Sequence, residues 1–285
     1  MSIFVSGASG QLGQLVVDHL LEQGHAVVAG SRDPGKLAPL SARGVKTRRF
    51  DYTNADSVRS ALQGVDRALF ISSDTVGHRR DPQVAAVATA AEVGVRHLVY
   101  TSIVSADQPS MAVSEDHRAT EQAIAKHFES YSILRNNLYA ELVLGAVAPA
   151  LASGTLYTAR EEGRISWVSR DDCARAAMTA LTDGFDGART LDITGPQALS
   201  GDEMAAVFAG LSGKAVTHTS LPAAAMIEGI TSSGLPRPLA EMLVGFDRSA
   251  AAGLLGNASP DLENLIGRRG TELRTVLEGA RAAWS

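Results

Sequence analysis

The first residues whose types and spacing suggest chemistry form a glycine-rich turn near the start of the chain. The run from Gly7 to Gly13 follows a short apolar segment and opens a predicted helix. Glycines let the backbone approach a pyrophosphate, and a helix N-terminus offers N–H groups and partial positive charge. A dinucleotide site is therefore expected, although a plain structural turn would also contain glycines. The residues expected to contact the cofactor here are Gly7, Ser9, Gly10, Gln11, Leu12 and Gly13.

The residues at the end of the second predicted strand indicate which dinucleotide binds. NAD-binding proteins usually place Asp or Glu there to accept from the ribose 2′-hydroxyl, whereas this chain has Ser31 followed by Arg32. A guanidinium suits a 2′-phosphate through paired, charge-assisted hydrogen bonds, so the expected cofactor is NADPH. Two alternatives remain: Arg32 is a solvated surface residue, or the neighbouring Asp33 pairs with Arg32 or accepts from the ribose of NADH.

Polar residues also end the next three predicted strands. Asp51 can accept from the adenine amino group or cap the following helix. Ile71–Ser73 would border the inner ribose and the nicotinamide, and Thr101–Ser102 would face the crevice where the strand order reverses. Carboxyl ends of parallel strands share one edge, so we expect these residues to lie together. The cofactor contacts expected from this edge are Arg32, Asp51, Tyr52, Ile71, Ser72, Ser73, Thr101 and Ser102.

Four residues near this crevice are expected to be catalytic: Ser102, His117, Asn137 and Tyr139. Short-chain dehydrogenases polarise a carbonyl with a serine at the Ser102 position and use a Tyr-x-x-x-Lys helix for proton transfer. Here His117 and Glu121 stand where that tyrosine and lysine would be, on one helix face. Glu121 would orient His117 and raise its pKa, making it a proton donor; the alternative is an ordinary surface pair. Asn137 and Tyr139 would touch nicotinamide or substrate, or cap the next helix.

The elements that would position these residues follow a regular alternation. Short apolar runs alternate with helical patterns through residue 135, which predicts βαβ units. The runs show little polar alternation, as is typical of parallel strands buried on both faces. We expect an α/β fold: a Rossmann-type doubly wound parallel sheet with a smaller, mainly helical C-terminal lobe. Residues 1–135 would form the NAD(P)-binding core and 136–285 the substrate-binding lobe, with strands near 155–193 returning to the core as an alternative.

Composition excludes several other classes of protein. The 285 residues carry a formal net charge of −5 without a Lys/Arg tract, which offers no electrostatic footprint for nucleic acid or membrane. The single cysteine, Cys173, excludes an intramolecular disulfide framework and is expected to be a core residue. Asp171–Asp172 are expected to cap a helix, and no metal is expected. The start of the chain lacks the pattern of a signal peptide and no apolar run is long enough to span a bilayer, so a cytoplasmic protein is expected.

These motifs together resemble the NmrA-like group of atypical short-chain dehydrogenases. Within the group, the chain is most similar to bacterial type-2 NAD(P)H:quinone oxidoreductases and triphenylmethane reductases. The resemblance covers nearly the whole chain, and the His-x-x-x-Glu helix is shared with this subgroup. It rests on Gly7–Gly13, Asp51–Tyr52, Leu62–Val65, Leu69–Ser73, Ala91–Val95, Tyr100–Ser102, His117–Glu121, Arg135–Tyr139 and Leu265–Gly267.

The resemblance implies NADPH in a Rossmann domain and hydride transfer to a quinone or a similar planar aromatic acceptor. A quinone needs a weaker general acid than a ketone, since the hydroquinone anion delocalises its charge. Two other functions are kept open: an NADP(H)-sensing regulator without turnover, and a tailoring oxidoreductase or oxygenase for a polycyclic aromatic natural product. A homodimer is compatible with the sequence. Residues that would wall an apolar substrate site, or simply pack the lobe, are Met226, Ile230, Met242 and Phe246.

Overall fold

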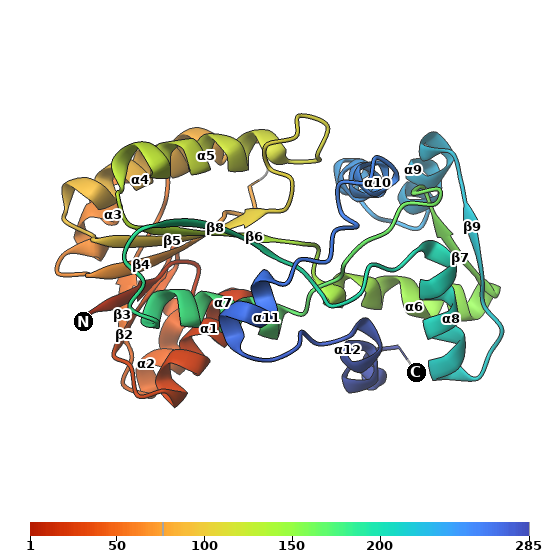
Figure 1. Cartoon of the computed structure of the whole chain (residues 1–285), viewed down its shortest axis with the longest axis horizontal. Helices are drawn as coiled ribbons and strands as arrows, with labels where there is room; N and C mark the ends of the chain where they lie inside the picture. The colour runs from red at the N-terminus through yellow and green to blue at the C-terminus, as the bar shows by residue number, and fades with distance from the viewer. Residues whose placement is uncertain (76, 285) are drawn as a thin grey trace.

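A parallel sheet organises the computed structural model, which describes residues 1–75 and 77–284 (Figure 1). Its seven strands run in the order β3-β2-β1-β4-β5-β6-β8, and every neighbouring pair is parallel. The order reverses between β1 and β4, which places a crevice at the carboxyl edge of these two strands. The strands are β1 (Ile3–Val5), β2 (Val27–Ser31), β3 (Lys46–Arg49), β4 (Arg67–Ile71), β5 (His97–Ile103), β6 (Tyr131–Asn136) and β8 (Ala188–Ile193).

Helices cover both faces of this sheet, above and below it in Figure 1. The two faces have separate apolar cores, and successive residues of one strand serve different cores: Val5 packs beneath the sheet and Phe4 above it. This arrangement explains the near-continuous apolar runs of the strands. The lower layer holds α1 (Gln11–Glu22), η1 (Pro34–Leu37), α2 (Ala38–Ala42), α7 (Arg170–Thr182) and α11 (Asp261–Ile266); the upper layer holds α3 (Ala55–Leu62), α4 (Arg80–Glu92) and α5 (Ser114–His127).

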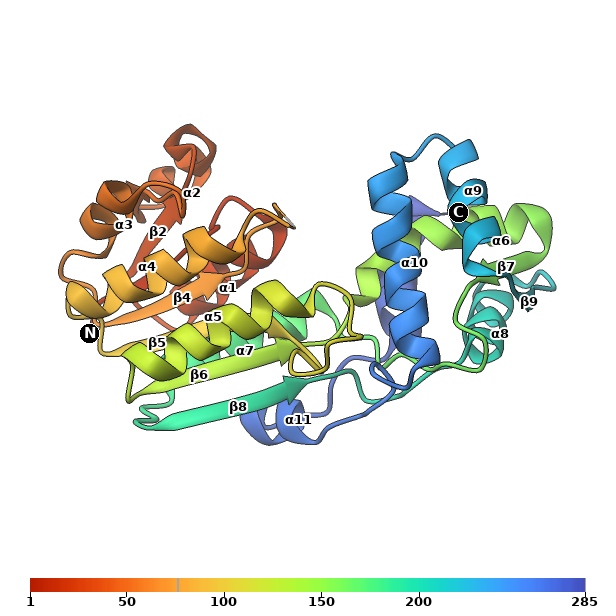
Figure 2. The ribbon, with the colours of Figure 1, turned by 90° about the horizontal axis from the view of Figure 1, so that it is seen from above.

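A second lobe stands beyond the carboxyl edge of the sheet (Figure 2). Its own apolar core includes Trp167, Phe208 and Trp284, and it also takes in Ile103 and Leu138 from the sheet edge. A two-stranded parallel sheet, β7 with β9, lies within it. The lobe comprises η2 (Ala140–Val143), α6 (Leu144–Ser153), β7 (Thr155–Thr158), α8 (Gly201–Ser212), β9 (Thr217–Ser220), α9 (Ala223–Ser232), α10 (Arg237–Ala251), α12 (Leu273–Gly279) and η3 (Arg281–Ala283).

The chain returns from this lobe to the sheet after β7. Helix α7 packs against α1, and β8 pairs with β6 along its whole length, from Tyr131–Ala188 to Asn136–Ile193. Helix α11 then packs against both α7 and β8. Part of the segment after residue 135 therefore completes the Rossmann layers, whereas β7 stays in the lobe.

Two smaller expectations concern the start of α7. The cap is Ser169, whose side chain accepts a hydrogen bond from the backbone N–H of Asp172, so the assignment of the cap to Asp171–Asp172 is wrong. The Asp172 side chain is fully buried and accepts from Arg268 at 2.6 Å, and Cys173 lies in the core as expected. Among the described residues, no helix is long and apolar enough to cross a membrane and no side-chain group suits a metal ion.

Candidate cofactor and substrate site

The glycine-rich turn has a different structural requirement at each glycine. Gly7 adopts a positive φ of 60°, which a glycine accepts without strain. A Cβ on Gly13 would lie 2.3 Å from the carbonyl oxygen of Gly7, so only glycine lets α1 pack this closely against the turn. A Cβ on Gly10 would meet only that same oxygen, at 3.3 Å, and would otherwise point into open space. Gly10 therefore leaves the space that a phosphate needs.

The N-terminus of α1 is suited to an anion. Its N-cap is Gly10, no side chain among the described residues caps it, and its first turn contains no acidic residue. Uncapped N–H groups and the helix dipole favour negative charge at this point. The hydroxyl of Ser9 lies 2.9 Å from that of Ser31, which ties the turn to the end of β2. The turn thus fits the pyrophosphate of a dinucleotide.

Arg32 projects from the end of β2 with 63% of its side chain exposed, and Asp74 lies 3.4 Å from its Nη2. Asp33 accepts a hydrogen bond from the N–H of Gly35 at 2.9 Å and caps η1. Asp33 therefore has a structural task that neither of the alternatives from the sequence included. Arg32 places a guanidinium at the end of β2, where a cofactor 2′-substituent would lie.

Asp51 and Tyr52 follow β3 and both form hydrogen bonds within the protein. Asp51 accepts from the N–H and the hydroxyl of Thr53, at 3.0 and 2.7 Å. Burial alone would raise the pKa of Asp51, but these bonds and the charges of nearby arginines hold it below its usual value. Asn54 caps α3, so the capping alternative for Asp51 is wrong. The Tyr52 hydroxyl donates to the carbonyl of Ile71 at 2.9 Å, and burial raises its pKa.

The ends of β1, β4 and β5 come together as expected. The side chain of Ile71 lies 3.6 Å from where a Cβ on Gly7 would be, directly beside the turn. The N–H of Ser72 donates to the hydroxyl of Thr101 at 2.9 Å, and the N–H of Ser73 donates to Gln83 Oε1 at 2.7 Å. These bonds fix the floor of the crevice where the nicotinamide half of a dinucleotide would lie.

The expected pairing of His117 with Glu121 is wrong. Buried His117 accepts from Arg79 Nη2 at its Nε2 (3.0 Å), while its Nδ1 lies 3.0 Å from the Tyr100 hydroxyl. Burial, and then the charge of Arg79, lowers the pKa of His117 to about 3, the opposite of the expected rise. The i, i+4 spacing places His117 and Glu121 on the same helix, but the side chain of each forms its hydrogen bonds with residues from other elements. A neutral imidazole with both nitrogens engaged is a poor proton donor.

Glu121 is bound instead to a serine and an arginine from the sheet. Arg135 donates to it from Nε and Nη2, at 3.0 and 2.8 Å, and the Ser102 hydroxyl donates to its Oε1 at 2.6 Å. Ser102 and Glu121 are buried. The Ser102 proton thus points to a carboxylate, which leaves it unavailable to polarise a substrate carbonyl in this conformation.

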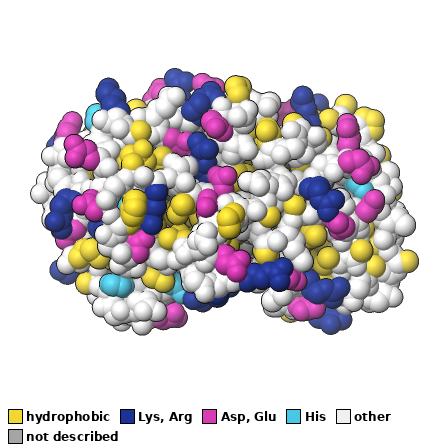
Figure 3. All heavy atoms as spheres, in the orientation of Figure 1, with side chains coloured by type: hydrophobic (Ala, Val, Ile, Leu, Met, Phe, Trp, Pro, Cys, Tyr) yellow, Lys and Arg dark blue, Asp and Glu magenta, His cyan; other side chains and the backbone are white. Residues whose placement is uncertain are grey.

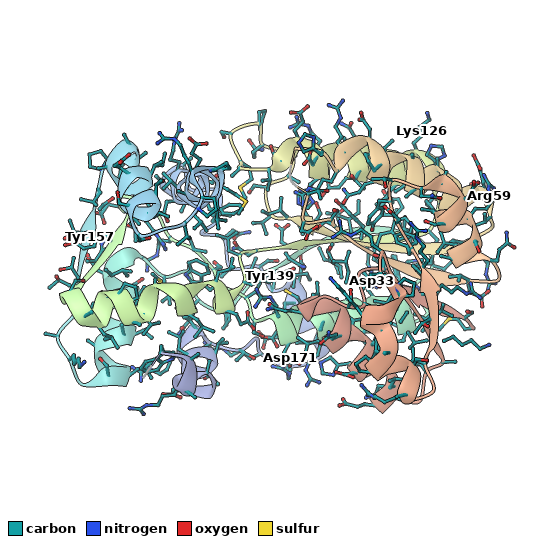
Figure 4. The ribbon with its side chains drawn as sticks, turned by 180° about the vertical axis from the view of Figure 1, so that it is seen from behind. Asp33, Arg59, Lys126, Tyr139, Tyr157 and Asp171 are labelled. Atoms are coloured by element: carbon teal, nitrogen blue, oxygen red, sulfur yellow. The ribbon has the colours of Figure 1, made fainter. Side chains whose placement is uncertain are left out.

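Asn137 and Tyr139 lie at the junction of the sheet and the second lobe, where Figure 4 labels Tyr139. Asn137 is buried and donates to the carbonyl of Leu255 at 2.9 Å. The ring of Tyr139 lies 4.9 Å from the guanidinium carbon of Arg170, and burial raises the pKa of its hydroxyl. Neither caps a helix through its side chain. In this structure both residues join the lobe to the sheet.

Two residues that engage His117 and Ser73, Arg79 and Gln83, were not predicted from the sequence. Arg79 donates from three nitrogens, to Asp116, His117 and the carbonyl of Ser73. Gln83 donates to both Tyr100 and Thr120. Both residues stand in or beside α4, and nothing in their spacing distinguishes them from the other polar residues of an arginine-rich chain.

Comparison with known proteins agrees with this geometry. The model of a family described as NAD(P)H-binding matches residues 7–184. The chain therefore belongs to the NAD(P)H-binding family, and the expected Rossmann-type fold is confirmed. The chain is 34% identical to quinone oxidoreductase 2 of Escherichia coli, over 95% of this chain and 96% of that protein. It is 27% identical to an NAD(P)H azoreductase of Xenophilus azovorans, over 98% of this chain and 97% of that protein.

Solved structures give the same result. The complex of the Escherichia coli NADPH-dependent quinone oxidoreductase with NADPH superposes with a TM-score of 0.94, at 33% identity, over 98% of this chain and 99% of that one. Citrobacter triphenylmethane reductase complexed with NADP(H) superposes with a TM-score of 0.93, at 31% identity, over 98% of this chain and 99% of that one. The resemblance inferred from the sequence motifs is thereby confirmed.

Proposed function

We propose that this protein is an NADPH-dependent oxidoreductase that transfers a hydride to a quinone or a similar planar aromatic acceptor. The observation that carries the proposal is the uncapped N-terminus of α1 beside the exposed guanidinium of Arg32. The names of its relatives agree: a quinone oxidoreductase, an azoreductase and a triphenylmethane reductase all reduce conjugated acceptors.

In this proposal the glycine-rich turn holds the pyrophosphate and Arg32 holds the 2′-phosphate. A cavity of about 290 Å³ near the end of β3, between α3 and α4, is the candidate adenine site. Asp51 stands next to it in sequence and can accept from the adenine amino group. The lining residues of the cavity are Tyr52, Thr53, Ala55, Val58, Asp81, Pro82, Ala85, Ala86 and Thr89.

The bound cofactor would supply the hydride, so the chain's task is to hold the two planar rings and keep water away from them. Because His117 is neutral and Ser102 donates to Glu121, neither of the expected acid–base positions offers a strong acid. A quinone tolerates this better than a ketone, because its reduced anion is stabilised by delocalisation and takes its proton from solvent. Half-buried apolar residues of α9 and α10 are the proposed wall for the acceptor: Met226, Ile230, Met242 and Phe246.

We also propose that the protein acts in the cytoplasm on a small molecule, without nucleic acid as a partner. The viewed surface intersperses acidic and basic side chains and shows no extended basic region (Figure 3). Mixed charge of this kind gives no strong attraction to a polyanion.

The test is a cofactor-dependent acceptor screen of the purified protein, with benzoquinones, naphthoquinones, azo dyes and triphenylmethane dyes, in aerobic and anaerobic arms. NADPH oxidation that accelerates with a quinone in both arms, with one hydroquinone formed per NADPH, supports the proposal. Oxidation that requires dioxygen and inserts oxygen into the acceptor would instead identify an oxygenase. Tight NADPH binding without turnover on any acceptor would identify a sensor.

A further inference from the structure

An ion pair bridges the strands that flank the glycine-rich turn. Arg32 follows β2 and Asp74 follows β4, and these two strands lie on either side of β1 in the sheet. Arg32 Nη2 lies 3.4 Å from Asp74 Oδ1, so the pair spans the carboxyl end of β1, from which the turn emerges. The adenosine half of a dinucleotide has to lie in this region.

The position of Asp74 is defined by the residues next to it. The N–H of Ser73 donates to Gln83 Oε1 at 2.7 Å, and the carbonyl of Ser73 accepts from Arg79 Nη1 at 2.6 Å. Arg79 is itself buried, with Asp116 and His117 as further partners. The backbone just before Asp74 is therefore fixed against α4 and α5, which holds the carboxylate within reach of Arg32.

The pair is also easily displaced. The side chains of Arg32 and Asp74 are 63% and 80% exposed, so water screens their attraction. A 2′-phosphate carries more charge than a carboxylate and matches the guanidinium fork with more acceptor oxygens. A phosphate arriving at Arg32 would replace Asp74 as the main partner and would then lie close to its negative charge.

We propose that Asp74 is a specificity-determining residue that competes with the adenosine 2′-phosphate for Arg32. The proposal rests on the proposed role of Arg32. Asp74 lowers the affinity for NADPH and NADP⁺ and leaves NADH, which has no 2′-phosphate, almost unaffected. It thereby reduces the discrimination between the two cofactors and shortens the time that NADP⁺ stays bound after hydride transfer.

The test measures binding to the apo protein by calorimetry, with adenosine 2′,5′-bisphosphate and 5′-ADP as probes, independently of turnover. Asp74→Asn is expected to tighten the bisphosphate by about two- to fivefold at low salt, the range for an exposed ion pair, and to leave 5′-ADP unchanged. The gain should shrink at high salt, because screening weakens both the pair and the repulsion.

Two controls separate the pair from general electrostatics. Asp33→Asn removes the same charge one residue from Arg32 but at a side chain that caps η1, and it should change the bisphosphate affinity less than Asp74→Asn does. In an Arg32→Ala background, Asp74→Asn should have little effect, since a double-mutant cycle isolates the coupling of the two residues.

Equal effects of Asp33→Asn and Asp74→Asn, or no effect of Asp74→Asn while Arg32→Ala still weakens the bisphosphate, would overturn the proposal and leave the NADPH assignment intact. If Arg32→Ala weakens the bisphosphate and 5′-ADP equally, the assignment of Arg32 to the 2′-phosphate fails, and the competition fails with it.

Discussion

Nη2 of Arg79 lies 3.0 Å from Nε2 of His117, in the buried space between α4, α5 and β5. A guanidinium keeps its protons at every physiological pH, so Nε2 accepts and Nδ1 carries the imidazole proton toward the Tyr100 hydroxyl, also at 3.0 Å. The pair therefore selects one neutral tautomer. His117 acts here as a positioning residue: it holds Arg79, and Arg79 holds the carbonyl of Ser73 at the crevice.

The first prediction is that the rate near neutral pH does not depend on the protonation of His117. Its pKa of about 3 lies well below the pH range in which the enzyme would be assayed. The pH profile of kcat/KM for quinone reduction should therefore be the same near pH 6.5 in the parent protein and in His117→Gln. His117→Gln retains an acceptor for Arg79 and should keep most of the activity, whereas His117→Leu should lower both Tm and NADPH affinity. An acid limb between pH 6 and 7 that disappears in His117→Gln would restore the proton-donor assignment.

The second prediction separates cofactor binding from fold stability at two glycines that are three residues apart, Gly10 and Gly13. Gly13→Ala should lower the free energy of unfolding by several kcal/mol, because its Cβ would lie 2.3 Å from the carbonyl oxygen of Gly7. Gly10→Ala should fold with nearly normal Tm, since its Cβ meets that oxygen at 3.3 Å, and should bind NADPH at least about tenfold more weakly. Denaturant titration and calorimetry measure the two effects. The reverse pattern would contradict the assignment of Gly13 to helix packing and of Gly10 to cofactor binding.

The third prediction concerns Ser102. Because its hydroxyl donates to Glu121 at 2.6 Å, Ser102→Ala should destabilise the fold by about 1–3 kcal/mol through a lost charge-assisted hydrogen bond. Its kcat for a quinone should stay within about threefold of the parent value. Ser102→Thr, which keeps the hydroxyl, is the matched control for stability. A kcat loss of about a hundredfold or more in Ser102→Ala, the range for an oxyanion donor, would show that Ser102 polarises the acceptor.

The fourth prediction concerns the pH dependence of stability. It rests on His97, the first residue of β5, at the end of the strand away from the crevice. Its ring nitrogens lie 2.7 Å from Ser130 Oγ and 3.1 Å from Ser132 Oγ, and burial, followed by the charges of Arg67 and Arg189, lowers its pKa to about 4. In the unfolded chain this histidine has a pKa near 6.5, so it binds a proton at pH values where the folded protein keeps His97 neutral. The contribution of neutral His97 to the free energy of unfolding is therefore fully present above about pH 6.5 and is lost as the pH falls toward 4.

His97→Asn should flatten this fall by up to about 1.4 kcal/mol per pH unit, the value for one proton. His127→Asn, at an exposed residue of α5, is the matched control for replacing a histidine by asparagine. Urea titrations between pH 4 and pH 7.5 measure both variants. An unaltered slope in His97→Asn would show that His97 is not a source of the acid sensitivity.

The sequence defined the features that depend on local chemistry. The turn from Gly7 to Gly13 and the guanidinium of Arg32 need only a strand, a turn and a helix in series, so their positions follow from the order of residues. The burial of the strands on both faces could also be predicted from the sequence. Adjacent apolar residues such as Phe4 and Val5 point to opposite faces of a strand, and each packs in a separate core.

The hydrogen-bond partners of the α5 side chains could not be predicted from the sequence. Spacing on one helix suggested that Glu121 would serve His117, but a buried carboxylate gains more from the fork of Arg135 than from an imidazole. The choice between these partners depends on which side chains β6 and the segment before α4 deliver to the same place. That information lies in the tertiary packing, and no periodicity carries it.

The return of α7 and β8 to the sheet sets a limit on how this protein can be divided. A fragment ending at residue 135 would lack β8, so β6 would present its unpaired backbone groups as an open edge strand. It would also lack α7, leaving apolar residues of α1 such as Val16 and Val17 partly uncovered. Such a fragment is expected to aggregate, and an isolated cofactor-binding module requires the 170–193 segment to be spliced back onto the first 136 residues.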